Sequence, residues 1–117
     1  MLIAIIEYEL NPGVQAEFEA EIGRLMPRLH AIDGFLQADA AASLGTPGRF
    51  YEISYWTDAA SLERWAKDPA HLRAKVRGRE ALLRWYRIRI AEISRDWQVG
   101  VLPADLALPS SPSADAR

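Results

Sequence analysis

Two residues of the segment 49–56 could carry out chemistry together: a carboxylate, Glu52, and a tryptophan, Trp56, four residues further on. If the segment is a strand, alternate side chains point the same way, and Glu52 lies on one face with Phe50 and Trp56. A carboxyl group buried between large aromatic rings has a raised pKa and can act as a base near neutral pH. An ion pair with one of the chain's many arginines is the alternative for Glu52.

Trp65 and His71 form a second candidate group, in the helical segments after this strand. The ordinary pKa of histidine suits a proton acceptor at physiological pH, and an indole ring offers a flat surface on which an aromatic substrate can stack. Arg73 and Arg77 could stabilise an anion formed on such a substrate. The alternatives are a solvated histidine on a helix surface and simple core packing for the tryptophans.

Absent residue types and motifs narrow the chemistry further. The chain has no cysteine, which excludes thiolate metal sites, iron–sulfur clusters and cysteine nucleophiles. The serine-hydrolase elbow, the Walker loop, the Rossmann glycine pattern and the His-Glu-x-x-His motif are also missing, so these enzyme classes are not indicated. The two histidines, His30 and His71, are far apart in the sequence, and we expect no metal site.

Size and charge point to a single soluble domain. The chain has 117 residues, of which 50% are hydrophobic. Residues 1–60 hold 3 basic and 9 acidic side chains and residues 61–97 hold 10 and 5, but the pI of about 5.7 argues against nucleic-acid binding. The apolar start meets Glu7 with no basic residue before it, which predicts neither a signal peptide nor a membrane span and favours a cytoplasmic protein.

Apolar periodicity and capping residues predict the elements that position these side chains. We expect strands over residues 2–10, 35–44, 49–56 and 85–97. A helix with one apolar stripe separates the first two strands, and two helical segments precede the last strand. Thr57 or Asp58 begins one of these segments and Asp68-Pro69 the other, in which Leu72 and Val76 form the apolar side. This order predicts an α+β fold with a four-stranded sheet.

The predicted sheet is apolar on both faces, because Tyr51, Ile53 and Tyr55 oppose Phe50 and Trp56. Two helical layers can cover only one face of such a sheet. The other face requires a partner, and we expect a two-fold homodimer in which the uncovered sheets pack together.

The composition changes after Trp97 and divides the chain into two parts. We expect a folded domain over residues 1–97, followed by a C-terminal arm or disordered tail over residues 98–117. Within the second part, residues 98–108 are apolar enough to dock on a neighbouring subunit.

The stretch Tyr51–Trp65, followed by Asp68–His71, resembles the antibiotic biosynthesis monooxygenase family. Further similar features are Pro12-Gly13, Gly34-Phe35, and Tyr86 with Arg95, so that the resemblance extends over residues 2–97. It implies a ferredoxin-like βαββαβ fold with an antiparallel sheet, assembled as a dimeric α/β barrel. It also implies a pocket between the helices and the sheet of each subunit.

Family members that the sequence resembles include cofactor-free oxygenases of phenolic polyketides, quinol monooxygenases and haem-degrading monooxygenases. In the first type an Asn precedes the Trp at the end of the third strand by four residues; Trp56 matches this Trp, whereas Glu52 replaces the Asn. The haem-degrading type has an Asn on the first strand and a His ten residues after a Trp. Trp65 matches that Trp, but the first strand has no Asn and Lys75 replaces the His.

The resemblance and the candidate residues together predict a cofactor-independent monooxygenase that uses dioxygen and a small aromatic substrate, a phenol, quinol or polyketide. Glu52, Trp56 and His71 are the expected catalytic residues, with Glu52 or His71 as the base. The expected substrate-binding residues are Trp65, Arg73 and Arg77. Two alternatives stay open: a dimer that binds an aromatic ligand without transforming it, and a haem-binding or haem-degrading enzyme with a different site, in which His71 could ligate the iron.

Overall fold

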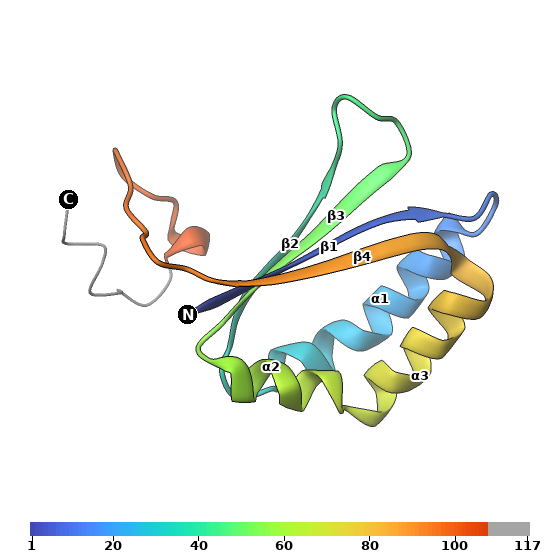
Figure 1. Ribbon diagram of the computed structural model, residues 1–117, viewed down its shortest axis with the longest axis horizontal. Coiled ribbons are helices and arrows are strands. Elements are labelled where there is room, and N and C mark those ends of the chain that lie inside the picture. The colour runs from blue at the N-terminus through green and yellow to red at the C-terminus, as the bar shows by residue number, and fades with distance from the viewer. Residues whose placement is uncertain (108–117) are drawn as a thin grey trace.

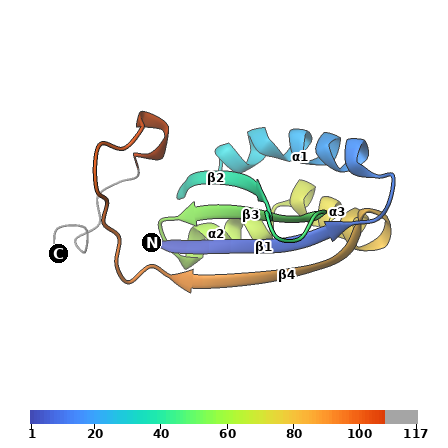
Figure 2. The ribbon, with the colours of Figure 1, turned by 90° about the horizontal axis from the view of Figure 1, so that it is seen from above.

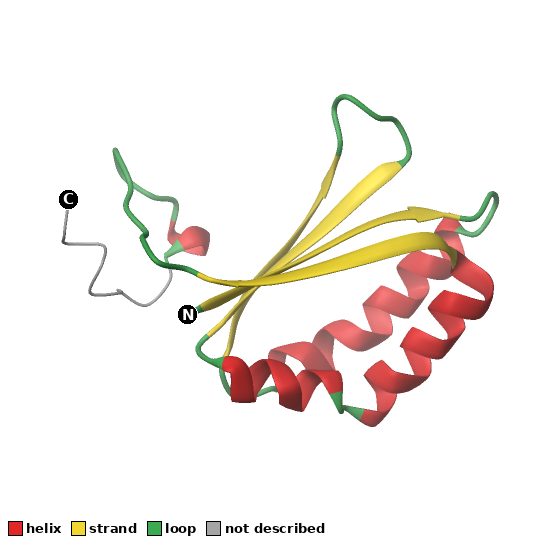
Figure 3. Ribbon diagram, in the orientation of Figure 1, coloured by secondary structure: helices red, strands yellow, loops and turns green. Residues whose placement is uncertain are grey.

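The computed structural model describes residues 1–107. It shows a four-stranded sheet with three helices on one of its faces (Figures 1 and 3). The strands are β1 (Leu2–Leu10), β2 (Phe35–Ala42), β3 (Arg49–Trp56) and β4 (Leu83–Glu92), and the helices are α1 (Gln15–His30), α2 (Ala59–Ala66) and α3 (Pro69–Arg77). A π-helical turn, Gly78–Leu82, joins α3 to β4, and a short 3-10 turn, Ala104–Leu106, follows later. None of the helices within residues 1–107 is long and apolar enough to span a membrane.

The strand order is β2-β3-β1-β4, and each neighbouring pair is antiparallel (Figure 2). This topology confirms the predicted ferredoxin-like α+β fold. The central strand β1 places Leu2 opposite Trp56 and Ile6 opposite Glu52. Because side chains alternate between the faces, Glu52 and Trp56 share the face that the helices cover, as predicted.

The last strand is shorter than predicted and begins earlier. We expected it over residues 85–97, whereas β4 spans Leu83–Glu92. Its partner is β1, where Leu2 lies opposite Glu92, and the amide of Ile93 makes the final bond to the carbonyl of Met1 at 3.0 Å. The pairing with β1 ends at this bond, and β4 ends with it, three residues after Arg89. The tail predicted to end the chain lies partly outside the described residues, over 108–117.

Helices α2 and α3 begin at the aspartates that the sequence indicated. Asp58 accepts a hydrogen bond from the amide of Ser61 at 2.9 Å, and the Ser61 hydroxyl lies 3.4 Å from the amide of Asp58, which completes a capping box. Asp68 accepts bonds from the amides of Ala70 and His71 at 3.0 and 3.2 Å. The second cap fixes where α3 starts and therefore where His71 lies.

Helix α3 presents to the sheet a face other than the expected one. Leu72 and Val76, predicted as its apolar side, are 47% and 42% exposed. The residues that face the sheet are His71, Ala74 and Lys75, which line a cavity. Because this face borders open space rather than a packed core, it need not be apolar, and the apolar stripe was a misleading guide to the orientation of α3.

Candidate active site

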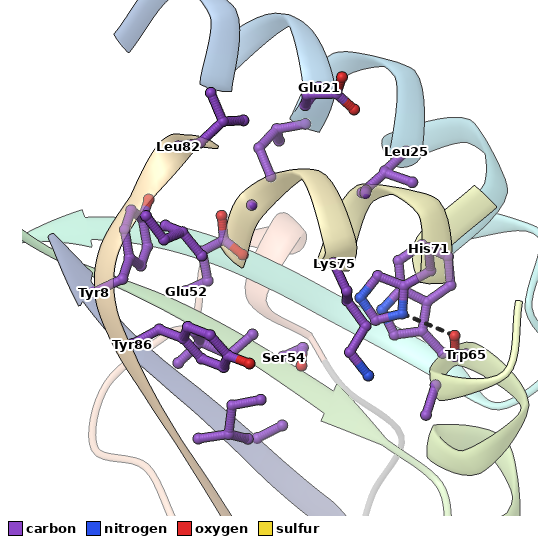
Figure 4. A pocket seen from close by; sticks show the side chains of 18 of the residues that line it. Tyr8, Glu21, Leu25, Glu52, Ser54, Trp65, His71, Lys75, Leu82 and Tyr86 are labelled. Carbon is purple, nitrogen blue, oxygen red and sulfur yellow. Dashed lines mark hydrogen bonds between the residues drawn. The ribbon is translucent and has the colours of Figure 1, made fainter. Parts of the chain in front are cut away.

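A cavity of about 320 Å³ lies between the helices and the covered face of the sheet (Figure 4). This volume is at the small end of the range for small-molecule sites. Most of its wall is apolar, and the polar side chains in it are Tyr8, Glu21, Glu52, Ser54, Trp65, His71, Lys75 and Tyr86. Tyr86, Ile88 and Ile90 of β4 line the cavity and remain exposed, so it opens along this edge strand.

Small residues create the space. Ala4 lies opposite Ser54 in the sheet, and Ala66, Ala74 and Gly78 line the cavity from the helical side. At these positions the helices and the sheet approach each other without long side chains to fill the gap between them. The hollow is thus a consequence of residue size at positions that come from five separate elements: β1, β3, α2, α3 and the π-helical turn.

Trp65 and His71 are held together as one unit. Their rings are stacked, with centroids 4.2 Å apart and an interplanar angle of 10°. The Nδ1 atom of His71 lies 2.9 Å from the carbonyl oxygen of Trp65 (dashed line in Figure 4). A carbonyl oxygen only accepts hydrogen bonds, so Nδ1 carries the proton and Nε2 keeps a free lone pair in the neutral ring.

The protonation state of His71 suits a base. Burial lowers the pKa of His71 below its ordinary value, the hydrogen bond to Trp65 opposes this shift, and the positive charge of Lys75 adds to it. The imidazole is therefore neutral at physiological pH, with the unprotonated Nε2 that a proton acceptor requires.

Glu52 is a second proton acceptor in the same cavity. Burial raises the pKa of Glu52, and the charge of Glu52 contributes to the raised pKa of Tyr8, after burial of the phenol itself. Within residues 1–107 no lysine or arginine forms an ion pair with Glu52. The alternative of an arginine partner therefore has no support in the described part of the chain.

Trp56 lies behind the cavity and is not part of its lining. The indole is 1% exposed and packs in a core cluster with Leu2 and Leu29. Its Nε1 donates a hydrogen bond of 2.9 Å to the hydroxyl of Ser54, which does line the cavity. The hydrogen bond to Ser54 is thus the link between Trp56 and the cavity lining.

Arg73 and Arg77 are not brought into the cavity. Arg73 is exposed, and the guanidinium of Arg77 pairs with Glu17 and, at 3.2 Å, with Glu21. The cation that α3 contributes to the lining is Lys75. The helical repeat explains the difference, because residues three and four positions after His71 share its face, whereas Arg73 lies on the far side.

Sequence reasoning missed the cavity residues Tyr8, Ser54, Lys75 and Tyr86. A usable signal exists for each of them. Ser54 alternates with Glu52 on β3, and Tyr8 and Tyr86 face each other in the sheet register. Lys75 follows His71 by one helical turn.

The start of α3 is tied to α1 by an ion pair with two hydrogen bonds. Arg28 Nε and a terminal nitrogen of Arg28 donate to the two carboxylate oxygens of Asp68 at 3.0 and 2.8 Å. The guanidinium of Arg28 is the largest cause that lowers the pKa of Asp68 to about 2. Since Asp68 also accepts from the amide of His71, this contact holds the position of the candidate base.

The model of the antibiotic biosynthesis monooxygenase family matches residues 1–77. This match covers more than half of the chain, and the chain therefore belongs to this family.

Individual relatives agree with this assignment. The jasmonate monooxygenase ABM of Pyricularia oryzae is 36% identical over 94 residues, which are 80% of this chain and 44% of the relative, so the chain spans less than half of that protein. A Pseudomonas aeruginosa protein of known crystal structure is 33% identical, with a TM-score of 0.65 over 77% of this chain and 90% of that one. SnoaB of Streptomyces nogalater, a cofactor-independent oxygenase, shares the fold at 17% identity, with a TM-score of 0.68 over 81% and 94% of the two chains.

The cavity is poorly suited to haem. Haem carries two carboxylates, whereas Lys75 is the one lysine or arginine among the residues within 1–107 that line the cavity, and Glu21 and Glu52 line it as well. The imidazole of His71 is also stacked flat on Trp65, which restricts the space around it for a macrocycle.

Proposed function

We propose that this protein is a cofactor-independent monooxygenase that acts on a small aromatic substrate of the phenol or quinol type. The observation that carries the proposal is His71, a neutral base with a fixed proton position, in a small and largely apolar cavity. Membership of the monooxygenase family supports it. So does the likeness to SnoaB, which is described as a cofactor-independent oxygenase.

The reaction needs no oxidant other than dioxygen. An ionised phenol can transfer an electron to dioxygen, and recombination of the two radicals forms a C–O bond at a ring carbon that is ortho or para to the phenol oxygen and carries a hydrogen. Loss of the hydrogen on that carbon, with cleavage of the O–O bond, then gives a quinone and water. The substrate supplies four electrons; one oxygen atom ends in the quinone and the other in water.

The two bases of the cavity match the two protons that must move. His71 Nε2 removes the hydroxyl proton to form the phenolate and then gives this proton to the peroxide. Glu52 removes the proton from carbon and gives it to the departing hydroxide, which leaves as water. The apolar wall excludes solvent from the charged intermediates, and the Ser54 hydroxyl can donate to the developing oxygen anion.

The test is oxygen incorporation from ¹⁸O₂. Purified protein is incubated with 1-naphthol and 1,4-dihydroxynaphthalene, and the products are analysed for ¹⁸O after subtraction of spontaneous oxidation. We expect label in the product, and a loss of between about 10²- and 10⁴-fold in turnover for His71→Gln and for Glu52→Gln. Arg73→Gln, on the same helix but outside the cavity, is the matched control and keeps wild-type turnover.

Two results would contradict the proposal. One is a wild-type rate in both the His71 and the Glu52 variant. The other is thermal stabilisation by the phenols without any consumption of dioxygen, which would identify a protein that binds an aromatic ligand and does not transform it.

We also propose that the protein is a homodimer that pairs through the uncovered sheet face. Ile3, Ile5 and Ile53 lie on this face, whereas α1, α2 and α3 all lie on the opposite one (Figure 3). Beyond β4, Trp97, Val99 and Val101 are exposed on a segment that extends past the end of the sheet, so residues 98–108 are proposed to dock on the partner. Sedimentation should give twice the monomer mass of 13.1 kDa; a stable monomer at micromolar concentration would refute this assembly.

A further inference from the structure

Lys75 is a cation without a counter-ion in a largely apolar cavity. Its side chain is half-buried and descends from α3 into the cavity beside His71 (Figure 4). Within residues 1–107 it forms neither an ion pair nor a side-chain hydrogen bond. A charge removed from water without a partner is costly, so the cavity favours an anionic ligand at this point.

The two carboxylates of the cavity do not neutralise Lys75. Glu21 is held by ion pairs with Arg24 and Arg77 on the helical side. Glu52 has a pKa raised by burial alone, with no contribution from a positive charge. The charge of Lys75 acts instead on His71, whose pKa it helps to lower. The cavity therefore has a cationic region at Lys75, beside the neutral His71, and an acidic region at Glu52.

We propose that Lys75 binds a carboxylate of the substrate, and that the substrate class is a hydroxyarene carboxylic acid with its hydroxyl group next to the carboxylate. This inference rests on the proposed monooxygenase function and specifies its substrate. The carboxylate pairs with Lys75 in a charge-assisted hydrogen bond, and the neighbouring hydroxyl then lies at His71, the proposed base.

The same arrangement selects for a single negative charge. One cation is available to the substrate, and a second carboxylate at the far end of the molecule would meet Glu52 and the phenol of Tyr8. Repulsion therefore disfavours binding of an aromatic dicarboxylate. A substrate with one carboxylate pairs with Lys75 and places no second charge at Glu52.

The experiment compares a carboxylate with its own uncharged ester. Dissociation constants for 1-hydroxy-2-naphthoate and methyl 1-hydroxy-2-naphthoate are measured by calorimetry under nitrogen, with wild type, Lys75→Met, Lys75→Arg and Arg73→Met. Wild type should bind the acid about tenfold more tightly than the ester. Lys75→Met should abolish this preference, whereas Lys75→Arg and the exposed-cation control Arg73→Met should keep it.

The outcomes separate this inference from the proposed function. An acid preference that persists in Lys75→Met, with an unchanged melting temperature, would overturn the assignment of Lys75. If binding depends on Lys75 but no ¹⁸O is incorporated, the carboxylate site is supported and the proposed monooxygenase function is refuted. If ¹⁸O is incorporated into 1-naphthol and 1-hydroxy-2-naphthoate at equal rates, the monooxygenase function is supported and the preference for a carboxylate is refuted.

Discussion

The covered face of the sheet has two parts. We call the part around Trp56, Leu2 and Leu29 the packed half, and the part that lines the cavity the hollow half. At the packed half Trp56 is 1% exposed and contacts Phe35 edge to face, with ring centroids 5.3 Å apart. At the hollow half Ile90, which also points to the helical side, is 57% exposed. Both residues are large and apolar and lie on the same face of one sheet. The comparison shows that an apolar side chain can point toward the helices and still not be packed against them.

What differs between the halves is the size of the residues that approach from the helices. Leu29 of α1 reaches Trp56, whereas the parts of α2 and α3 above the cavity present Ala66 and Ala74. The close packing around Trp56 thus lies toward β3, whereas the open part of the cavity lies toward β4.

Removal of the side chain should have its largest effect at the packed half. Trp56→Ala is expected to destabilise the fold by about 3–5 kcal/mol, because it leaves a void in a closely packed cluster. Ile90→Ala should cost about 1 kcal/mol or less, since its side chain is already largely in contact with solvent. Urea unfolding of both variants measures the difference. Equal losses would mean that the cavity edge is packed as tightly as the core.

Added volume at the packed half should also be costly. Gly34 has a φ of +95°, and a Cβ built on it would lie 2.3 Å from Cβ of the fully buried Ser61. Gly34→Ala is therefore expected to cost about 2–4 kcal/mol from backbone strain and overlap together. The control is Gly23→Ala in α1, where no atom lies within 4 Å of the new Cβ and helix propensity predicts a gain of up to about 1 kcal/mol.

A pH titration should separate the contribution of the α3 cap from the rest of the fold. The pKa of Asp68 is about 2 in the folded protein, below the ordinary value of 3.8, so its contribution is complete above pH 4 and is lost as the pH falls toward 2. Asp68→Asn keeps an N-cap residue but removes the charge that pairs with Arg28. The variant should melt below wild type at pH 7, and the two curves should converge near pH 2. A constant gap would contradict the role of the ionised carboxylate.

The smallest change in stability should come from filling the hollow half. Ala74→Leu adds volume where space is available, so we expect a change in unfolding free energy within about 0.5 kcal/mol. The same substitution should abolish binding of 1-hydroxy-2-naphthoate, because it occupies the cavity. A stable variant with unchanged affinity would place the ligand elsewhere.

The fold was predictable because local features specify it. Alternating apolar residues indicated the strands, and Asp58 and Asp68 marked the helix starts through bonds that they make within their own turns. The cavity was not predictable in the same way. It depends on Ala4 and Ala74, which come from elements far apart in the sequence, and nothing local to either residue shows that they face each other.

Two candidate cations outside the cavity illustrate the same limit. Arg73 and Arg77 were predicted to bind the substrate, but the orientation of α3 about its axis decides which cation lines the cavity, and that cation is Lys75. The apolar residues Leu72 and Val76 suggested the wrong orientation. The stack of Trp65 on His71 was equally hidden, because it forms across the break between α2 and α3.

The ties between α3 and α1 have a consequence for how a molecule reaches the cavity. Arg28 and Asp68 join the two helices at the start of α3, and Arg77 and Glu21 join them at its end. These two contacts oppose an outward movement of α3. We therefore expect a ligand to enter along the exposed edge of β4, past Tyr86, where the cavity is already open.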